Sequence, residues 1–256
     1  MSRRRWGVLL VLGVVVLSGC VGKPVDKVTL EVDLPPEFRF IASAHYLPAT
    51  GENCSLPQRR GKRPERKIFV TQYKPVAERV SLDLPLAEVI EGCPTVLRSV
   101  GFDLRAKWGV RYADVGGDHA VIGIRDRWDV VSTVPEPGVQ AVFGTCRWLF
   151  RTLGPYHAIR KILQCRSLDA YGEPRLAGGV AQRDQLAGKK LRMVLALSDE
   201  EQPYFDDNWV PVPGGWKRCK GKSLEDMDAF CRGNTTDFKP ITMPDGRLCD
   251  VYPSCQ

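Results

Sequence analysis

Two of the three histidines lie near side chains that assist proton transfer in catalytic sites. Asp118 directly precedes His119, and Ser43 lies two residues before His45. Because adjacent residues of a β-strand point to opposite faces, we expect Asp118 and His119 to act separately. Ser43 and His45 share one strand face, but a serine nucleophile also needs an oxyanion site, and the sequence shows no motif for one.

The familiar catalytic and ligand-binding motifs do not occur in this sequence. It contains no G-x-S-x-G elbow for a lipase-type serine, no H-E-x-x-H pair for zinc and no G-x-x-x-x-G-K-[ST] loop for phosphate. Carboxylates cluster between positions 199 and 207, without the spacing of an EF-hand calcium loop. We therefore predict a protein without enzymatic activity, metal site or cofactor.

Eight of the nine cysteines form an even set that predicts disulfide bonds in an oxidising compartment. Zinc is disfavoured because no C-x-x-C pair is present. Connectivity does not follow from the sequence, but pairing of nearest neighbours would join the first two, join the next two and leave the last four to pair among themselves. The set consists of Cys54, Cys93, Cys146, Cys165, Cys219, Cys231, Cys249 and Cys255.

Two stretches have the composition of binding loops. Between 199 and 216, acidic and aromatic side chains alternate with prolines and glycines, which favours a stiff recognition loop because a stiff loop loses little entropy on binding. Between 57 and 67, a dense basic stretch would attract acidic partners or anionic head groups. Packing on the protein's own sheet and a solvated connection between strands are the respective structural alternatives. The candidate residues are Asp199, Glu200, Glu201, Tyr204, Phe205, Asp206, Asp207, Trp209 and Trp216 in the first stretch, and Arg59, Arg60, Lys62 and Arg63 in the second.

The elements that carry these residues are predicted to be mainly β-strands. Apolar side chains alternate with polar ones in residues 28–34, 79–86 and 99–109, while 119–126 and 189–199 are more continuously apolar. Short strands separated by proline and glycine turns favour an antiparallel, sandwich-like sheet stapled by disulfides. The sequence Pro244-Asp245-Gly246 predicts a tight turn between two further short strands.

One segment and one boundary depart from this pattern. In 146–165, Pro155 and apolar residues at helical spacing predict a short helical hairpin within a β-rich domain that spans 20–166. Residues 167–188 show little periodicity, so we expect a linker or long loop there. The remainder, 189–256, is disulfide-rich and either forms a small subdomain or completes the first sheet.

The first nineteen residues predict an export signal. Arg3, Arg4 and Arg5 precede an apolar run from Val8 to Leu17, which has the length of a signal-peptide core. The sequence Leu17-Ser18-Gly19-Cys20 resembles the lipobox of bacterial lipoproteins. That resemblance implies cleavage after residue 19 and acylation of Cys20, so that lipid holds the mature chain on a membrane in the periplasm. The absence of aspartate after Cys20 implies, by analogy with that family, the inner leaflet of the outer membrane.

Net charge disfavours a nucleic-acid partner, because removal of the three signal arginines leaves 34 basic against 30 acidic residues. The general plan of the chain resembles immunity lipoproteins of type VI secretion effectors. This resemblance implies a protein partner, namely a toxic secreted hydrolase such as a phospholipase or peptidase, that the chain binds and neutralises. Two alternatives are an envelope assembly or structural lipoprotein that binds another envelope component, and a divergent periplasmic hydrolase.

Overall fold

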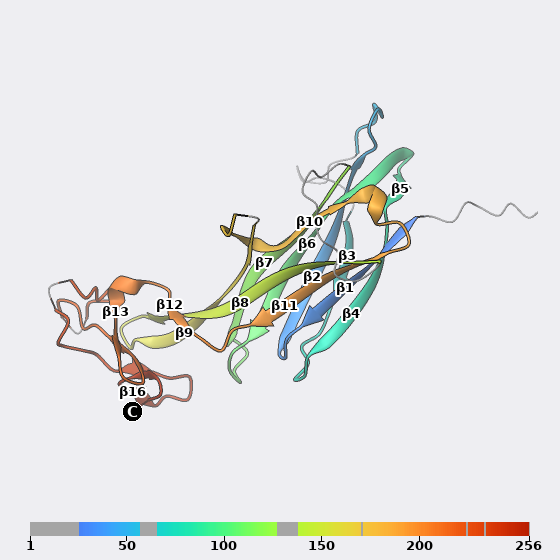
Figure 1. Ribbon diagram of the computed structural model, residues 1–256. Coiled ribbons are helices and arrows are strands. Elements are labelled where there is room, and N and C mark those ends of the chain that lie inside the picture. The colour runs from blue at the N-terminus through green and yellow to red at the C-terminus, as the bar shows by residue number, and fades with distance from the viewer. Residues whose placement is uncertain are drawn as a thin grey trace, which may run out of the picture.

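The computed structural model describes residues 26–56, 66–126, 138–169, 171–223, 225–232 and 234–255. Within these residues the fold is mainly β, with seventeen strands, two short 3-10 turns and no α-helix (Figure 1). None of the described residues belongs to a helix with the length and apolar content needed to cross a membrane. The prediction of a mainly β fold is therefore confirmed.

Fourteen strands form one curled, mixed sheet shaped like a half-barrel. Ten of them follow the order β3-β2-β6-β7-β10-β9-β8-β11-β1-β4, and four short strands pair beside this path. The ten are β1 (Lys27–Leu34), β2 (Phe38–Pro48), β3 (Arg66–Val70), β4 (Glu78–Pro85), β6 (Cys93–Lys107), β7 (Val115–Arg125), β8 (Val139–Leu153), β9 (Ala158–Leu168), β10 (Pro174–Gln182) and β11 (Lys190–Leu197). The four are β5 (Ala87–Ile90), β12 (Gln202–Pro203), β15 (Ile241–Thr242) and β16 (Leu248–Cys249).

The alternating pattern of the sequence places one face of each strand in a shared core. In β1, for example, Val28, Leu30 and Val32 are buried, and they face the buried side chains of β2 and β6 across the curl. The expected antiparallel, sandwich-like arrangement is corrected in two respects. One curled sheet takes the place of two packed sheets, and β1 and β8 both pair with β11 in parallel, as β7 does with β10. β11 lies between β1 and β8 and runs in the same direction as both, so the sheet contains parallel as well as antiparallel pairs.

The predicted helical hairpin at 146–165 is wrong. These residues form the antiparallel strands β8 and β9, and a turn at Gly154 and Pro155 joins them. Ile159 and Leu163 produced the helical signal because residues four apart lie on the same side of a helix and also on the same face of a strand. Their burial is equally consistent with either structure, and pairing between β8 and β9 decides the outcome.

Residues 167–188, for which a linker was expected, contribute β10 and the 3-10 turn η1 (Arg183–Gln185). β10 crosses β8 at close range, and glycines make the crossing feasible. A Cβ atom on Gly144 of β8 would lie 2.6 Å from that of Ala177 of β10, and one on Gly178 of β10 would lie 2.0 Å from the backbone oxygen of Val121 in β7, the parallel neighbour of β10. The glycines that permit this approach also remove the alternation by which a strand is recognised.

Residues 199–255 pack around the far end of the β8–β9 hairpin (Figure 1). This C-terminal segment contains the 3-10 turn η2 (Asp206–Asn208) and a separate sheet of β13 (Trp209–Val212), β14 (Gly215–Arg218) and β17 (Tyr252–Pro253). It has its own small core. β11 belongs to the main sheet, whereas the described residues after it pack around a separate small core. The C-terminal segment lies at the end of the molecule opposite the start of β1 (Figure 1).

The described residues contain four disulfides, and each joins two cysteines that follow one another in the chain order of the eight. The pairs are Cys54–Cys93, Cys146–Cys165, Cys219–Cys231 and Cys249–Cys255. Cys146 and Cys165 are direct partners in the β8–β9 register, so this bond braces the hairpin. The last two pairs lie inside the C-terminal segment, where regular structure is sparse.

The close approach of β10 to its parallel neighbour β7 yields a stability prediction. We expect Gly178→Ala to lower the free energy of unfolding by more than about 2 kcal/mol, because the added methyl group meets backbone atoms and the residue has φ of +119°. Gly172→Ala is the control: it has φ of +81° but open space around it, so it should cost only about 1 kcal/mol. Urea unfolding would measure both values, and equal losses would contradict the close approach of β10 to β7.

Candidate functional site

The structure separates the nine candidates of the 199–216 stretch into buried and exposed groups. Trp209 is buried and its ring meets Phe150 edge-on at a centroid distance of 4.8 Å, with Trp216 at 6.1 Å from the same ring. Both tryptophans therefore belong to the core of the C-terminal segment. For these two tryptophans, packing on the protein's own strands applies rather than a role in a recognition loop.

Glu201 also has a structural role. Its carboxylate forms an ion pair with the Lys161 ammonium of β9 and accepts a hydrogen bond from the Tyr252 hydroxyl. Burial, together with the neighbouring Glu201 charge, raises the pKa of Tyr252 and keeps its hydroxyl protonated. The two contacts fasten the start of the C-terminal segment and its last strand to β9.

Tyr204 and Phe205 remain at the surface. They are 42% and 47% exposed, and their rings meet edge-on at a centroid distance of 4.6 Å. The Arg151 guanidinium of β8 lies 5.7 Å from the Tyr204 ring centroid, within cation–π range. The neighbouring Asp206 is exposed, as are Asp199, Glu200 and Asp207 from the same set of candidates.

Other exposed apolar residues, which no sequence motif marks, lie beside this pair. Phe205, Leu153 and Met227 line one small pocket of about 230 Å³. The Cys231 amide donates to the Asp207 backbone oxygen at 2.6 Å, which brings the loop that carries Phe230 beside η2. We call Leu153, Tyr204, Phe205, Met227 and Phe230 the C-terminal aromatic surface. The only sign of Met227 and Phe230 in the sequence is that they are large apolar residues within the acidic stretch 225–230.

A buried arginine holds the loops beneath this surface. Arg218 is 2% exposed, and its guanidinium donates to Thr152 Oγ1 at 2.9 Å and to the backbone oxygens of Asn208, Ala229 and Asp228 at 3.1, 2.6 and 2.9 Å. Burial lowers its pKa to about 10, so the side chain stays charged at neutral pH. One side chain thus connects β8 with the loops on both sides of the aromatic surface.

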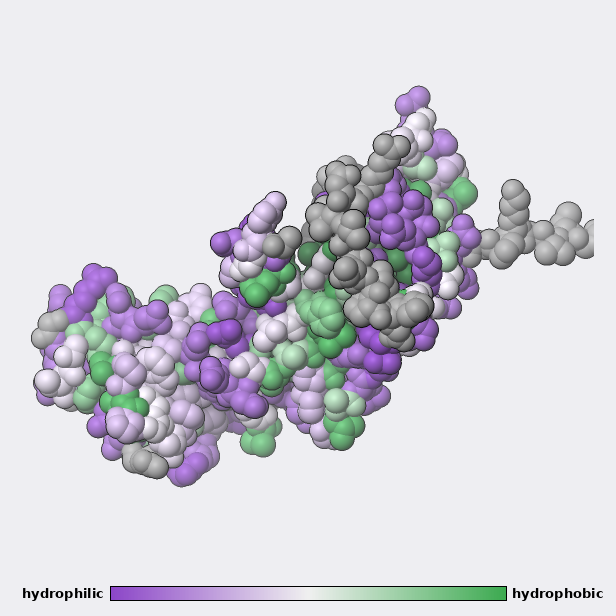
Figure 2. Space-filling view, in the orientation of Figure 1, coloured by the Kyte–Doolittle hydropathy of each residue, from purple (hydrophilic) through white to green (hydrophobic). Residues whose placement is uncertain are grey.

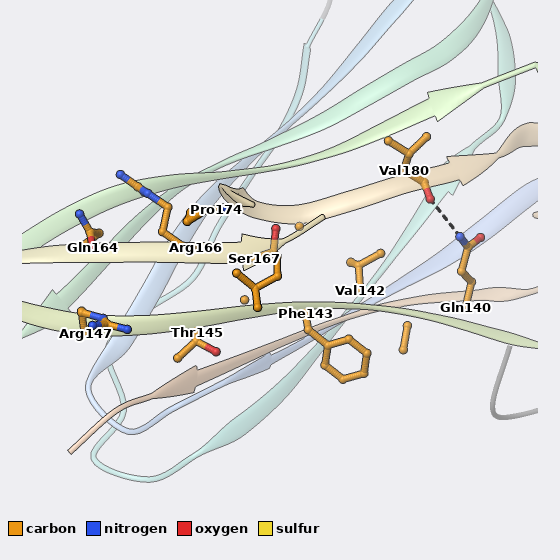
Figure 3. Close-up of a pocket in the computed structure, with 14 residues that line it drawn as sticks. Gln140, Val142, Phe143, Thr145, Arg147, Gln164, Arg166, Ser167, Pro174 and Val180 are labelled. Carbon is orange, nitrogen blue, oxygen red and sulfur yellow. Dashed lines mark hydrogen bonds between the residues drawn. The ribbon is translucent and has the colours of Figure 1, made fainter. Parts of the chain in front are cut away.

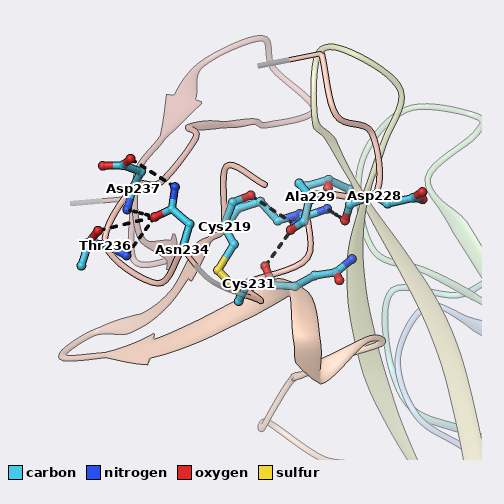
Figure 4. Close-up of a disulfide and its surroundings, with 10 residues drawn as sticks. Cys219, Asp228, Ala229, Cys231, Asn234, Thr236 and Asp237 are labelled. Atoms are coloured by element: carbon cyan, nitrogen blue, oxygen red, sulfur yellow. Dashed lines mark hydrogen bonds between the residues drawn. A yellow bond between two sulfur atoms is a disulfide. The ribbon is translucent and has the colours of Figure 1, made fainter. Parts of the chain in front are cut away.

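The Cys219–Cys231 disulfide reinforces the same floor. Figure 4 shows this bond beside Asp228 and Ala229, whose backbone oxygens accept from Arg218. Further along, the Asn234 side-chain oxygen accepts from the Asp237 amide at 2.9 Å and closes the following turn. The aromatic surface therefore rests on loops fixed by hydrogen bonds and by a covalent bond.

The histidine candidates lie elsewhere, on the outer face of the main sheet. Ser43 and His45 of β2 and His119 of β7 border one open pocket of about 430 Å³, together with Asp103 of β6. Asp103 is the register partner of His119, a juxtaposition that sequence reasoning missed. Asp118 points away from this pocket, since its carboxylate accepts from the Cys165 amide at 2.6 Å and from Arg166 at 2.9 Å.

Several predictions fall on residues outside the described part of the chain. These are the export signal, Cys20 and the basic candidates Arg59, Arg60, Lys62 and Arg63. Within the described residues, no group of three or more histidine, cysteine or acidic side chains is placed to hold a metal ion.

The third histidine, His157, is buried in the turn between β8 and β9 and is 1% exposed. It has φ of +47°, and its backbone oxygen accepts from the Thr242 amide at 3.0 Å. Burial, with the positive charges of Lys239 and Arg218 and despite the opposing charge of Asp226, lowers the pKa of His157 to about 4. The imidazole is therefore neutral in the folded chain at pH 7.

The lowered pKa of His157 makes stability depend on pH. The unfolded chain takes up the proton near pH 6.5 and the folded chain only near 4, so stability falls as pH drops through this window, by up to about 3 kcal/mol. His157→Asn, which tolerates positive φ, removes this contribution. Urea unfolding at pH 7 and 4.5 should show a larger loss for the native chain than for the variant. An equal loss in both would contradict a neutral buried imidazole.

Comparison of this chain with family models, curated proteins and solved structures found no match.

Proposed function

We propose that this chain is an exported, membrane-anchored lipoprotein that binds and neutralises a secreted hydrolase through its C-terminal aromatic surface. The observation that carries the proposal is the exposed Tyr204–Phe205 pair on a floor fixed by Arg218 and the Cys219–Cys231 disulfide. Binding energy at protein interfaces concentrates in such aromatic side chains, and a rigid floor reduces the entropy lost on association. An inhibitor needs a complementary surface rather than a reactive group.

The charge of the C-terminal segment indicates which partner surface would fit. Residues 199–256 contain eleven acidic and seven basic side chains, whereas the mature chain as a whole is mildly basic. Asp206 and Asp207 directly follow the aromatic pair in the chain, and Asp228 borders the pocket beside Phe205. The expected partner face is therefore basic, with an apolar centre, and complementary charge would speed its capture.

The class of partner follows from the resemblance to immunity lipoproteins, and anchoring supports the same interpretation. Acylation of Cys20 would confine the chain to the surface on which a membrane- or wall-directed enzyme acts and would raise its local concentration there. Four disulfides agree with an oxidising setting outside the cytoplasm.

The proposal predicts stoichiometric inhibition that depends on the exposed pair. Each secreted hydrolase encoded beside the gene for this chain would be purified, and its hydrolytic rate measured at increasing concentrations of the chain. We expect one such enzyme to be inhibited, and Tyr204→Ala with Phe205→Ala to raise the inhibition constant at least about 30-fold, as loss of an interface anchor does. Tyr171→Ala, which removes a more exposed tyrosine from the turn between β9 and β10, is the matched control and should leave inhibition unchanged.

The two possible failures are distinct. If none of these enzymes is inhibited by the native chain, the neutralising function is wrong. If one is inhibited equally by the native chain and the double variant, the function stands and the binding surface lies elsewhere.

A further inference from the structure

A second concave surface lies on the main sheet, away from the C-terminal aromatic surface. β8 forms its floor from Gln140 to Arg147, and the hairpin of β9 and β10 forms its wall from Gln164 to Val180. The groove has a volume of about 990 Å³, at the upper end of the range for small-molecule sites. Figure 2 shows hydrophobic residues in the centre of the molecular face that β8 crosses.

The side chains of this groove change from polar to apolar along its length. Arg147, Gln164 and Arg166 lie together at one end, and Phe143 and Val142 lie farther along β8 (Figure 3). Leu168 lines the hairpin wall and is 71% exposed, and Phe143 is exposed on the floor. Large apolar side chains beside such a cavity are costly to hydrate and mark a surface that gains from being covered.

The apolar end of the groove is closed. The Gln140 side-chain amide donates to the Val180 backbone oxygen at 3.0 Å and so spans the gap between β8 and β10 (Figure 3). From this closure to Arg147 the floor extends about 23 Å at about 3.3 Å per residue. An acyl chain that reaches half of a bilayer's hydrocarbon core extends about 15 Å, so the floor accommodates one such chain and a head group.

The two arginines at the open end differ in their partners. Arg166 forms an ion pair with Asp118 at 2.9 Å. Arg147 donates to the neutral Gln202 side chain at 2.9 Å, and no carboxylate among the described residues is within ion-pair distance of it. An anionic head group at this end would therefore meet a guanidinium whose charge no carboxylate of the described residues neutralises.

A peptide strand fits this groove less well than an acyl chain. Beside Phe143, β8 is paired with β11 on one side and bridged to Gly178 of β10 on the other. The floor at that point offers side chains rather than an open strand edge, and a peptide backbone would lose its hydrogen bonds to water without replacement. A hydrocarbon chain has no such requirement.

We propose that this groove binds a single-chain amphiphile with an anionic head group. The acyl chain lies along Phe143 and Leu168, and the head group pairs with Arg147. This inference is independent of the proposed inhibitory function, because the groove and the C-terminal aromatic surface share no residue.

The test uses the whole chain with Cys20→Ala, so that no acyl group of its own competes, and titrates it with the fluorescent fatty acid cis-parinarate. We expect saturable binding that Leu168→Glu weakens at least about 10-fold. Leu248→Glu is the matched control, since Leu248 is 68% exposed and lies outside the groove. The control also accounts for any binding by the apolar N-terminal segment, which both variants retain. We expect Arg147→Gln to weaken binding of the acid more than binding of its methyl ester.

Three results would overturn the proposal: no saturable binding, equal binding by the Leu168→Glu and Leu248→Glu variants, or equal affinity of the native chain for the acid and its ester. Competition then separates the two sources of such a ligand, and either result supports the shared chemistry. Displacement of the probe by lysophosphatidylglycerol identifies a membrane lipid. Displacement by palmitate but not by lysophosphatidylglycerol identifies a free fatty acid.

Discussion

Strand β8 contributes to both hydrophobic cores, and the arrangement of the whole molecule depends on this continuity. Cys146 and Trp148 are buried in the core of the main sheet, while Phe150, two residues farther along the same face, is the centre of the C-terminal core. Because side chains of a strand alternate strictly, a shift of one residue would remove both sets from their cores at once. The Cys146–Cys165 bond fixes this register between β8 and β9.

The C-terminal segment shows how a chain with little regular structure can still present a defined surface. Its strands are short, so backbone pairing alone supplies few constraints. Side chains supply the missing constraints. The buried Arg218 guanidinium donates hydrogen bonds to several backbone carbonyl oxygens, and Glu201 contacts Lys161 and Tyr252. Such buried charged groups cost desolvation and are stable only when fully hydrogen-bonded, which favours one loop arrangement over others.

Local patterns in the sequence predict much of the sheet but less of its surfaces. Alternation identifies β1, β4 and β6, and a more continuous apolar run identifies β7 and β11, because each of these strands places a face in the shared core. It fails at β9, where a spacing of four suits helix and strand equally, and at β10, where glycines are required by a crossing with a distant strand. Local sequence also does not predict that Tyr204 is exposed while Trp209 is buried, since both are aromatic residues in one proline-rich stretch. The contact of Trp209 with Phe150 in the C-terminal core distinguishes the two. The groove requires three strands that only the tertiary fold brings together.

The opposite placement of the start of β1 and the C-terminal segment has a consequence for geometry at a membrane (Figure 1). With the lipid anchor proposed at Cys20, only six residues separate the tether from the first strand, so the long axis of the molecule acts as a spacer. The C-terminal aromatic surface would then be held above the bilayer, at a height set by the length of the molecule, rather than lie against the membrane. A bulky enzyme would be intercepted at that height, before its own active site touches the lipid or wall beneath.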